Sequence, residues 1–158
     1  LHYRRRRHSD RELSARAVRI AVLRERAEGE SRVAMTPETA RKFAALGAVV
    51  AVENGAGLGA AITDEAYREA GVEVGDAAAT VTGADIVLGV QAPEAALLAG
   101  ASPGAMVAAI FEPFANRARV DAHAAARFEA LAMEFMPRIT RAQSMDVLSS
   151  QSNLAGYK

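Results

Sequence analysis

The polar side chains near the end of the chain offer the clearest chemistry in this sequence. Residues 137–158 contain arginines, glutamines, an aspartate and several hydroxyl groups, and they follow a short apolar run. Glutamine both donates and accepts hydrogen bonds, which suits a carboxamide, and arginine presents a planar fork to phosphate or carbonyl oxygen. Four residues are therefore candidates for binding a polar ligand that carries amide and phosphate groups: Arg138, Gln143, Asp146 and Ser149.

The spacing of these candidates predicts how they are held. Pro137 ends the preceding strand, so residues 138–143 are expected to form an ordered turn at its carboxyl end, where open α/β sheets bind ligands. Asp146 falls in the first turn of an expected helix at 144–155, where the helix dipole favours an anion, and Ser149 lies one turn further on the same face. The alternative is a capped helix whose polar groups only satisfy one another.

The chain is poor in groups for acid–base chemistry. It has no cysteine, which excludes disulfides, thiol catalysis and thiolate metal sites, and we expect no metal site. His123 lies mid-helix among alanines and is expected at the surface or half-buried in a structural role. Lys42 and Lys158 are the lysines. Hydride transfer between two nicotinamides moves no proton at the reacting carbons, so this composition favours that reaction, or no chemistry at all.

Two other segments admit both a functional and a structural interpretation. Gly55, Gly57 and Ala60 fit G-x-G-x-x-A, a phosphate-binding pattern, but they follow the second expected strand and stand apart from the next helix cap at Thr63. A tight structural loop is the favoured interpretation. Arg32 lies among acidic residues and is expected either to pair with one of them or to clamp a ligand at the mouth of a cleft.

Apolar runs that alternate with helical patterns predict the elements that position these residues. Continuous apolar strands indicate burial on both faces. We therefore expect an α/β fold of three layers, flavodoxin-like or Rossmann-like, with a mostly parallel sheet and helices on both faces. Strands are expected at 18–23, 48–53, 72–74, 85–90, 105–111 and 131–135. Helices are expected from Thr36 to Gly47, from Thr63 to Gly71, at 76–82, from Pro93, at 116–129 and at 144–155.

The length, composition and charge distribution of the chain indicate one packed domain with a basic extension. Of the 158 residues, 51% are hydrophobic, which is enough for one packed domain, and no apolar run is long enough to span a bilayer. Residues 1–16 hold six arginines against two acids and are expected to form a disordered basic extension. The net charge is zero, so residues 17–158 are acidic overall. That balance argues against nucleic acid as a partner.

The same segments resemble a known family. Residues 137–157 (PRITRAQSMDVLSSQSNLAGY) resemble the alpha subunits of the proton-translocating NAD(P) transhydrogenase family. Residues 32–37 (RVAMTP) and 55–57 with 62–64 are similar to the wider family shared with alanine dehydrogenases. The likeness covers about 18–158. It implies that 17–158 is an N-terminal subdomain that stops before an NAD-binding Rossmann subdomain.

The resemblance also implies a function. Hydride would pass between NADH and NADP⁺, coupled to proton translocation, and this chain would be inactive alone. Gln143 and Asp146 would be catalytic. Arg138, Gln143, Asp146 and Ser149 would contact NAD, which the following subdomain would mainly bind, while NADP would sit on a partner domain. Further implications are a homodimer, NADP-binding and membrane subunits or domains as partners, and a cytoplasmic location peripheral to the inner membrane.

Two other functions stay open. In alanine dehydrogenases the resemblance implies a substrate arginine, a lysine and a histidine. Arg32 matches the arginine, but Gln91 stands at the lysine position, and residues 111–115 supply no histidine. An amino-acid substrate is therefore disfavoured. The remaining alternative is a non-catalytic module that binds a small ligand.

Overall fold

The structure is a computed structural model. It describes residues 16–137, 139, 140, 142, 145–147, 151, 152 and 156. Three of the four candidate site residues, Arg138, Gln143 and Ser149, lie outside the described residues, as does most of the expected helix at 144–155.

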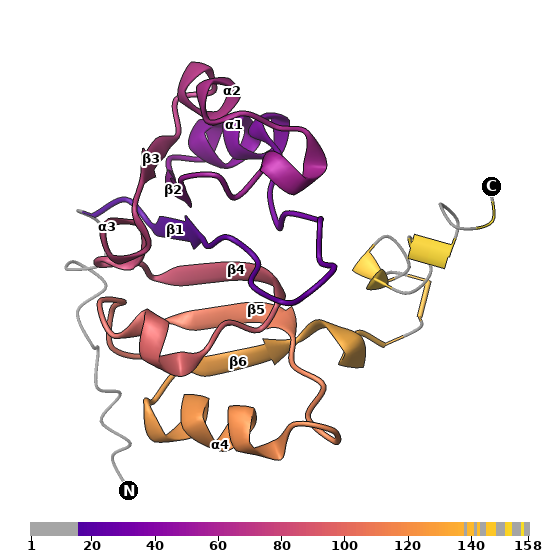
Figure 1. The fold of residues 1–158 in the computed structure, drawn as a ribbon. Helices are drawn as coiled ribbons and strands as arrows, with labels where there is room; N and C mark the ends of the chain where they lie inside the picture. The colour runs from indigo at the N-terminus through magenta and orange to yellow at the C-terminus, as the bar shows by residue number, and fades with distance from the viewer. Residues whose placement is uncertain are drawn as a thin grey trace, which may run out of the picture.

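Within the described part of the chain, six strands form one sheet in the order β3-β2-β1-β4-β5-β6 (Figure 1). Every neighbouring pair is parallel, which confirms the expected α/β fold. The strands are β1 Arg19–Val22, β2 Val49–Glu53, β3 Glu73–Gly75, β4 Ile86–Gln91, β5 Met106–Ile110 and β6 Glu129–Ala132.

Local capping signals begin each of the four α-helices found among the described residues. The side chains of Thr36, Thr63, Asp76 and Asn116 accept a hydrogen bond from the backbone N–H three residues on, which satisfies a free donor of the first turn. The helices are α1 Pro37–Ala45, α2 Asp64–Glu69, α3 Ala77–Val81 and α4 Arg117–Ala125. Three short 3₁₀ helices complete the described elements: η1 Leu58–Ala60, η2 Ala95–Leu98 and η3 Met133–Phe135.

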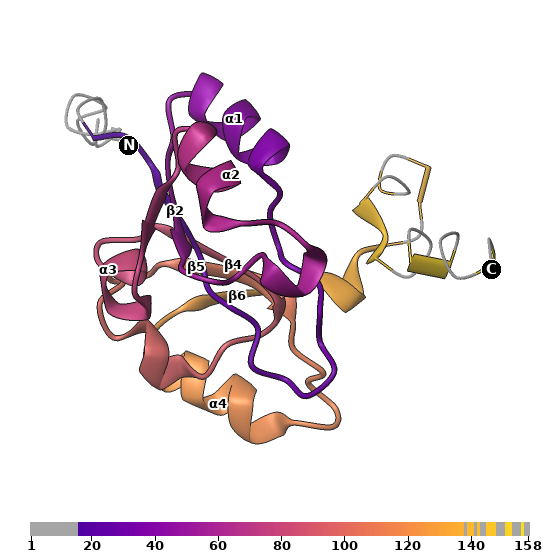
Figure 2. The ribbon, with the colours of Figure 1, turned by 45° about the horizontal axis from the view of Figure 1, so that its top comes forward.

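Alternating side chains of the strands build two apolar cores, one on each face of the sheet. Ile20 and Val22 of β1 point into the core that includes Ala40 of α1 and Tyr67 of α2. Ala21 of β1 points into the opposite core, which includes residues of α3, η2, β4 and β5. Figures 1 and 2 show α1 and α2 on one side of the sheet and α4 on the other. The expected three layers are therefore present.

The strand order places a crevice where ligands commonly bind. The chain leaves β1 toward β2 and β3 on one side, then returns through α3 to β4 on the other side of β1. The loops after β1 and β4 therefore diverge at the carboxyl edge, which is the topological switch point of the sheet. On the α1 face of β5, Met106, Ala108 and Ile110 are only partly buried, so this half of the face is less covered than the half over β1 and β2.

Three expected elements differ from the structure near the end of the sheet. The helix expected at 116–129 ends at Ala125, because Arg127 adopts a left-handed conformation (φ 61°) and Phe128 turns into the core. The last strand therefore begins at Glu129, two residues early, and 133–135 is a 3₁₀ turn. The helical stretch expected from Pro93 is the short η2.

Arg16, the last residue of the expected basic extension, contacts the domain. Its guanidinium donates to Asp85 Oδ1 at 2.5 Å and to the carbonyl oxygen of Gly83 at 3.1 Å. The hydrogen bond from Arg16, followed by one from the backbone of Arg19, lowers the pKa of Asp85. Arg16 thus contacts the amino edge of the sheet. The opposite, carboxyl edge is followed in the chain by residues 137–149, which we call the polar turn.

Candidate functional site

The polar turn follows the edge strand β6 and η3 in the chain, and its described residues lie beyond the carboxyl ends of the strands (Figure 1). Among its described residues, Ala142 and Asp146 are buried, whereas Ile139 and Met145 are more than half exposed. Asp146 stands directly before Val147, which is helical. Val147 shares a pocket with residues of β4 and β5, so the segment after the turn lies over the carboxyl edge of the sheet. The structure thus places Asp146 at the edge that the sequence predicts.

An apolar pocket of about 430 Å³ lies beneath this segment. It occupies the less covered half of the α1 face, between the loop after β1 and the start of the last helix. Two of its polar side chains, Arg32 and Gln151, lie close to each other, with 3.4 Å between Arg32 Nη1 and Gln151 Oε1. The other lining residues are Val33, Ala34, Leu88, Gly89, Val90, Ala108, Ile110, Met133 and Val147. The site can enclose a flat, largely apolar group with a polar substituent at the rim.

A β-bulge shapes the wall of this pocket. The register between β4 and β5 shifts between Leu88 and Gln91, and a Cβ at Gly89 would lie 2.6 Å from the carbonyl oxygen of Gln91. Glu25, in the loop after β1, accepts hydrogen bonds from the backbone N–H groups of Val90 (2.6 Å) and Gln91 (3.1 Å). Burial is the main cause that raises the pKa of Glu25, against these two hydrogen bonds. Glu25 therefore joins the two loops of the switch point.

Arg32 takes the first of the two roles that the sequence leaves open, and its role as a ligand clamp stays a prediction. Its Nε and Nη2 donate to the two carboxylate oxygens of Glu30 at 2.7 and 2.6 Å, so it is paired with a neighbouring acid. It also lines the apolar pocket. Gln91 Nε2 donates to Glu30 at 3.3 Å. The hydrogen bonds from Arg32 are the main cause that lowers the pKa of Glu30 to about 2.

Acidification is expected to remove the stability that the Glu30–Arg32 pair provides. The folded-state pKa of Glu30 is about 2, below the ordinary value of 4.5, so the contribution is complete above pH 4.5 and is lost as the pH falls through about 2. Because Arg32 is 40% exposed, solvent screening reduces the contribution to an order of 1–2 kcal/mol. Urea unfolding between about pH 2 and 6 measures this contribution.

The control for this titration is Glu30→Gln, which should lack the pair's part of the pH dependence. The pKa of Glu25 is raised mainly by burial, which both proteins share, so most of its opposite influence cancels in the difference. Parallel stability curves for the two proteins over this pH range would contradict the role given to the pair.

Glu134 fastens the start of the polar turn to the neighbouring strand. Its Oε1 accepts hydrogen bonds from the backbone N–H groups of Phe111 (2.9 Å) and Glu112 (2.5 Å), just after β5. Glu112 has a positive φ of 50°, an unusual conformation for a residue with a side chain. The sequence interpretation placed Glu134 in a strand and missed this role. Its acidic side chain amid the apolar residues 131–135 was the available signal.

Replacing Glu134 by alanine is expected to destabilise the protein by about 1.5–3 kcal/mol, because the N–H groups of the buried Phe111 and of Glu112 lose a charged acceptor. Urea unfolding of the wild type and the variant measures the difference. The matched control is Glu129→Ala, since Glu129 is exposed on β6 and forms no side-chain hydrogen bond or ion pair among the described residues. If Glu134→Ala lowered the free energy of unfolding no more than the control does, the role given to Glu134 would be contradicted.

The glycine-rich loop is packed against its own domain. A Cβ at Gly57 would lie 2.7 Å from the carbonyl oxygen of Ile62, and one at Gly59 would lie 2.8 Å from that of Ser31. The N–H of Gly55 donates to Asp64 Oδ1 at 2.9 Å. These contacts explain the glycines without a ligand and agree with the structural interpretation of this loop.

His123 is fully buried, so its expected surface or half-buried position is wrong. Its ring contacts Phe111 and Phe128 with centroid distances of 5.1 and 6.2 Å, and Nδ1 lies 2.9 Å from the carbonyl oxygen of Arg119. A carbonyl only accepts, so Nδ1 carries the proton. The alanines around His123 leave room for Phe128 to turn inward and cover the ring. The role of His123 is therefore structural, as an aromatic member of the core beneath α4.

The fold and the site together define a Rossmann-like α/β domain with an apolar pocket at the carboxyl edge of its sheet. The chain belongs to the family described as "Alanine dehydrogenase/PNT, N-terminal domain", whose sequence profile matches residues 21–155. The resemblance noted from the motifs is thereby confirmed.

Comparison with individual proteins gives the same family. A relative from Rhodospirillum rubrum, named as the first part of an NAD(P) transhydrogenase alpha subunit, is 46% identical over 150 residues, which cover 89% of this chain and 38% of the relative. A solved transhydrogenase from Sinorhizobium meliloti is 48% identical, with a TM-score of 0.83 over 88% of this chain and 42% of that one. A solved L-alanine dehydrogenase is 25% identical, with a TM-score of 0.77 over 88% of this chain and 38% of that one. The chain spans less than half the length of these relatives.

Neither a membrane-spanning helix nor a metal-binding cluster occurs among the described residues. None of their helices has the length and apolar character needed to cross a bilayer. In the same part of the chain, no group of three or more histidine, cysteine, aspartate or glutamate residues is arranged to hold a metal ion.

Proposed function

We propose that this chain is the NAD(H)-side, N-terminal part of an NAD(P) transhydrogenase that passes hydride between NADH and NADP⁺. The observation that carries the proposal is the apolar pocket at the carboxyl edge, lined in part by Val147 and Gln151, in a chain 46% identical to a relative named as a transhydrogenase subunit. The relative is longer than this chain, so activity belongs to a larger protein.

The described residues fit one end of a nicotinamide dinucleotide. The pocket beneath Val147 offers apolar walls to a pyridine ring and has Gln151 and Arg32 at its rim for a carboxamide. The glycine-rich loop has no space for a pyrophosphate beside Gly57 or Gly59, because the carbonyl oxygens of Ile62 and Ser31 fill it. We therefore assign the ring end of NAD to this chain and its phosphates to the residues that follow.

The residues of the polar turn have separate tasks in this proposal. When bound, NADH supplies the hydride. Ser149 holds the carboxamide, and Arg138 and Asp146 order the turn around the ring. Gln143 extends toward the second dinucleotide and keeps the two reacting carbons aligned. Because the transfer needs close approach rather than a proton, no histidine or lysine is required at the site.

The apolar pocket also excludes water from the reacting carbons. Leu88, Ile110 and Met133 line its wall, so a ring seated there exchanges its water contacts for apolar side chains. Direct transfer between two rings depends on that exclusion, because a proton donor in the gap would open side reactions. The face of the ring that points away from β4 and β5 stays open to a partner domain, so that the hydride can leave C4 perpendicular to the ring.

The remaining parts of the proposal concern the assembly. NADP(H) binds to a partner domain, and membrane subunits or domains couple the transfer to proton translocation. The NAD(H)-side part forms a homodimer in the cytoplasm and joins the membrane through these partners. The name of the Rhodospirillum rubrum relative supports a protein built from several parts, because it is called the first part of an alpha subunit.

The proposal is tested with the natural-length protein that carries this chain, combined with its NADP-binding partner. Mixing NADH with NADP⁺ should give NADPH, and omission of the partner should stop the reaction. Absence of NADPH formation from a preparation that binds both dinucleotides would reject the proposed function.

Alanine dehydrogenase is the second candidate, favoured by Arg32 at the pocket and by the likeness to a solved L-alanine dehydrogenase. The contacts of Arg32 weigh against it. Glu30 occupies two of its donors, and Gln91 supports Glu30 rather than offering a second cation. Oxidation of NADH with pyruvate and ammonia would favour this candidate over the first.

A further inference from the structure

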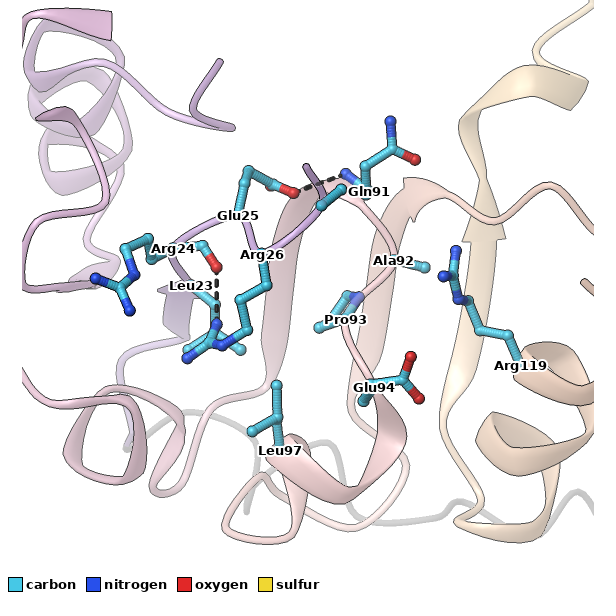
Figure 3. A pocket seen from close by; sticks show the side chains of 11 residues that line it. Leu23, Arg24, Glu25, Arg26, Gln91, Ala92, Pro93, Glu94, Leu97 and Arg119 are labelled. Atoms are coloured by element: carbon cyan, nitrogen blue, oxygen red, sulfur yellow. Dashed lines mark hydrogen bonds between the residues drawn. The ribbon is translucent and has the colours of Figure 1, made fainter. Parts of the chain in front are cut away.

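A second pocket lies in the switch-point crevice, apart from the one beneath the polar turn. It has a volume of about 200 Å³ and is lined by the loop after β1, the loop after β4, η2 and α4 (Figure 3). Its walls combine apolar side chains, among them Leu23, Pro93 and Leu97, with charged ones. Nothing in the hydride-transfer proposal uses this pocket.

Arg119 of α4 is the partly buried cation of this pocket whose charge has no partner among the described residues. Its backbone is engaged, because the N–H donates to Asn116 and the carbonyl accepts from His123. Its guanidinium forms no hydrogen bond or ion pair with any described residue, and Nε is buried without a partner among them. A partly buried guanidinium without an acceptor is costly, so an anion bound there would relieve the cost.

The other charged groups of the pocket are engaged elsewhere, exposed or unpaired with Arg119. Arg26 donates to Glu53 at 2.8 Å and to the carbonyl oxygen of Arg24 at 2.7 Å, and Glu25 is held by the backbone of the β4 loop. Arg24 is exposed, and its guanidinium points away from Arg119 in Figure 3. Glu94 makes no ion pair with Arg119 in the described part of the chain, although both point toward the same opening in Figure 3.

We propose that this pocket binds a small carboxylate with a short apolar tail. The carboxylate accepts hydrogen bonds from the planar guanidinium of Arg119, and the carbon chain packs against Pro93 and Leu97. The site is separate from the proposed dinucleotide site, because it lies on the α4 side of the sheet, where the second core is, whereas the other pocket lies on the α1 side.

The test is saturation-transfer NMR of butyrate with the natural-length protein. Saturating NADH is present, so that butyrate cannot bind at the dinucleotide site. Saturable binding is expected, tighter for butyrate than for acetate. Arg119→Gln should weaken it by about tenfold or more, because a hydrogen-bonded charged pair is lost. The matched control is Arg117→Gln on the same helix, where Arg117 is exposed and paired with Asp121. It should bind butyrate like the wild type.

A second variant keeps the test independent of any damage to α4. Glu94→Gln removes the competing carboxylate and is expected to tighten butyrate binding by about two- to fivefold. Equal affinity of the wild type and Arg119→Gln, or weaker binding by Glu94→Gln, would overturn the proposal. Because NADH fills its own site throughout, either result leaves the hydride-transfer proposal untouched.

Discussion

Replacing Gln143 by asparagine is expected to slow hydride transfer from NADH to NADP⁺ by about ten- to a hundredfold, with NADH affinity changed by no more than about twofold. Asparagine keeps the amide but shortens its reach by one methylene group. In the proposed function Gln143 aligns the two reacting carbons, so the loss falls on the transfer step rather than on NADH binding. Single-turnover kinetics and an NADH titration separate the two quantities.

The control for this variant is Thr140→Ser, in the same turn. Thr140 is exposed, and it has no part in the proposed site. Its variant should transfer hydride at the wild-type rate. Wild-type turnover in Gln143→Asn, or a loss that appears only as weaker NADH binding, would reject the role given to Gln143.

Replacing Gly57 by alanine is expected to destabilise the protein by about 2–3 kcal/mol. The new methyl carbon would lie 2.7 Å from the carbonyl oxygen of Ile62 and 2.9 Å from Cε2 of Tyr67. Neither neighbour can give way easily, because one is backbone and the other is a buried ring whose hydroxyl donates to the carbonyl oxygen of Met35 at 2.7 Å. Urea unfolding of the two proteins measures the difference.

Gly100→Ala serves as the control, because its new Cβ would meet neighbours at ordinary contact distances of 3.4 Å or more. Its effect should stay within about 0.5 kcal/mol. If Gly57→Ala were as stable as this control and lost NADH affinity instead, the glycine-rich loop would be a phosphate-binding loop, contrary to our interpretation.

Most of the sheet is predictable from local signals in the sequence. Short apolar runs mark β1, β2, β4 and β5, and threonine followed by proline or an acid marks the starts of α1 and α2. These signals are decided by neighbouring residues in the chain. The parallel arrangement follows because the intervening helices require crossover connections.

The end of the sheet could not be predicted in the same way, because distant contacts decide it. Phe128 leaves the helical pattern to cover His123, whose ring contacts Phe111, and Glu134 leaves the strand pattern to accept from the backbone after β5. The contact of His123 with Phe111 and the hydrogen bond of Glu134 join residues that are far apart in the sequence, so the local periodicity does not predict them. The burial of His123 has the same cause.

The sequence predicts some features of the candidate site and not others. The residue types of the polar turn predict a ligand site there, and Asp146 is buried next to Val147, which lines the pocket at the expected edge of the sheet. The predictions for Arg138, Gln143 and Ser149 remain untested, because these residues lie outside the described part. The sequence did not show which acid pairs with Arg32, since three glutamates stand near it in the chain. The support that Gln91 gives to Glu30 depends on the order of the strands.

The proposed function requires that hydride passes directly from one dinucleotide to the other at the polar turn and the apolar pocket. An isotope experiment follows the label from NADH deuterated at C4 in the natural-length protein with its NADP-binding partner. With direct transfer, the deuterium appears at C4 of NADPH without exchange with water. Loss of the label to solvent, or its recovery only in alanine when pyruvate and ammonia are supplied, would show that the chain does not serve this reaction.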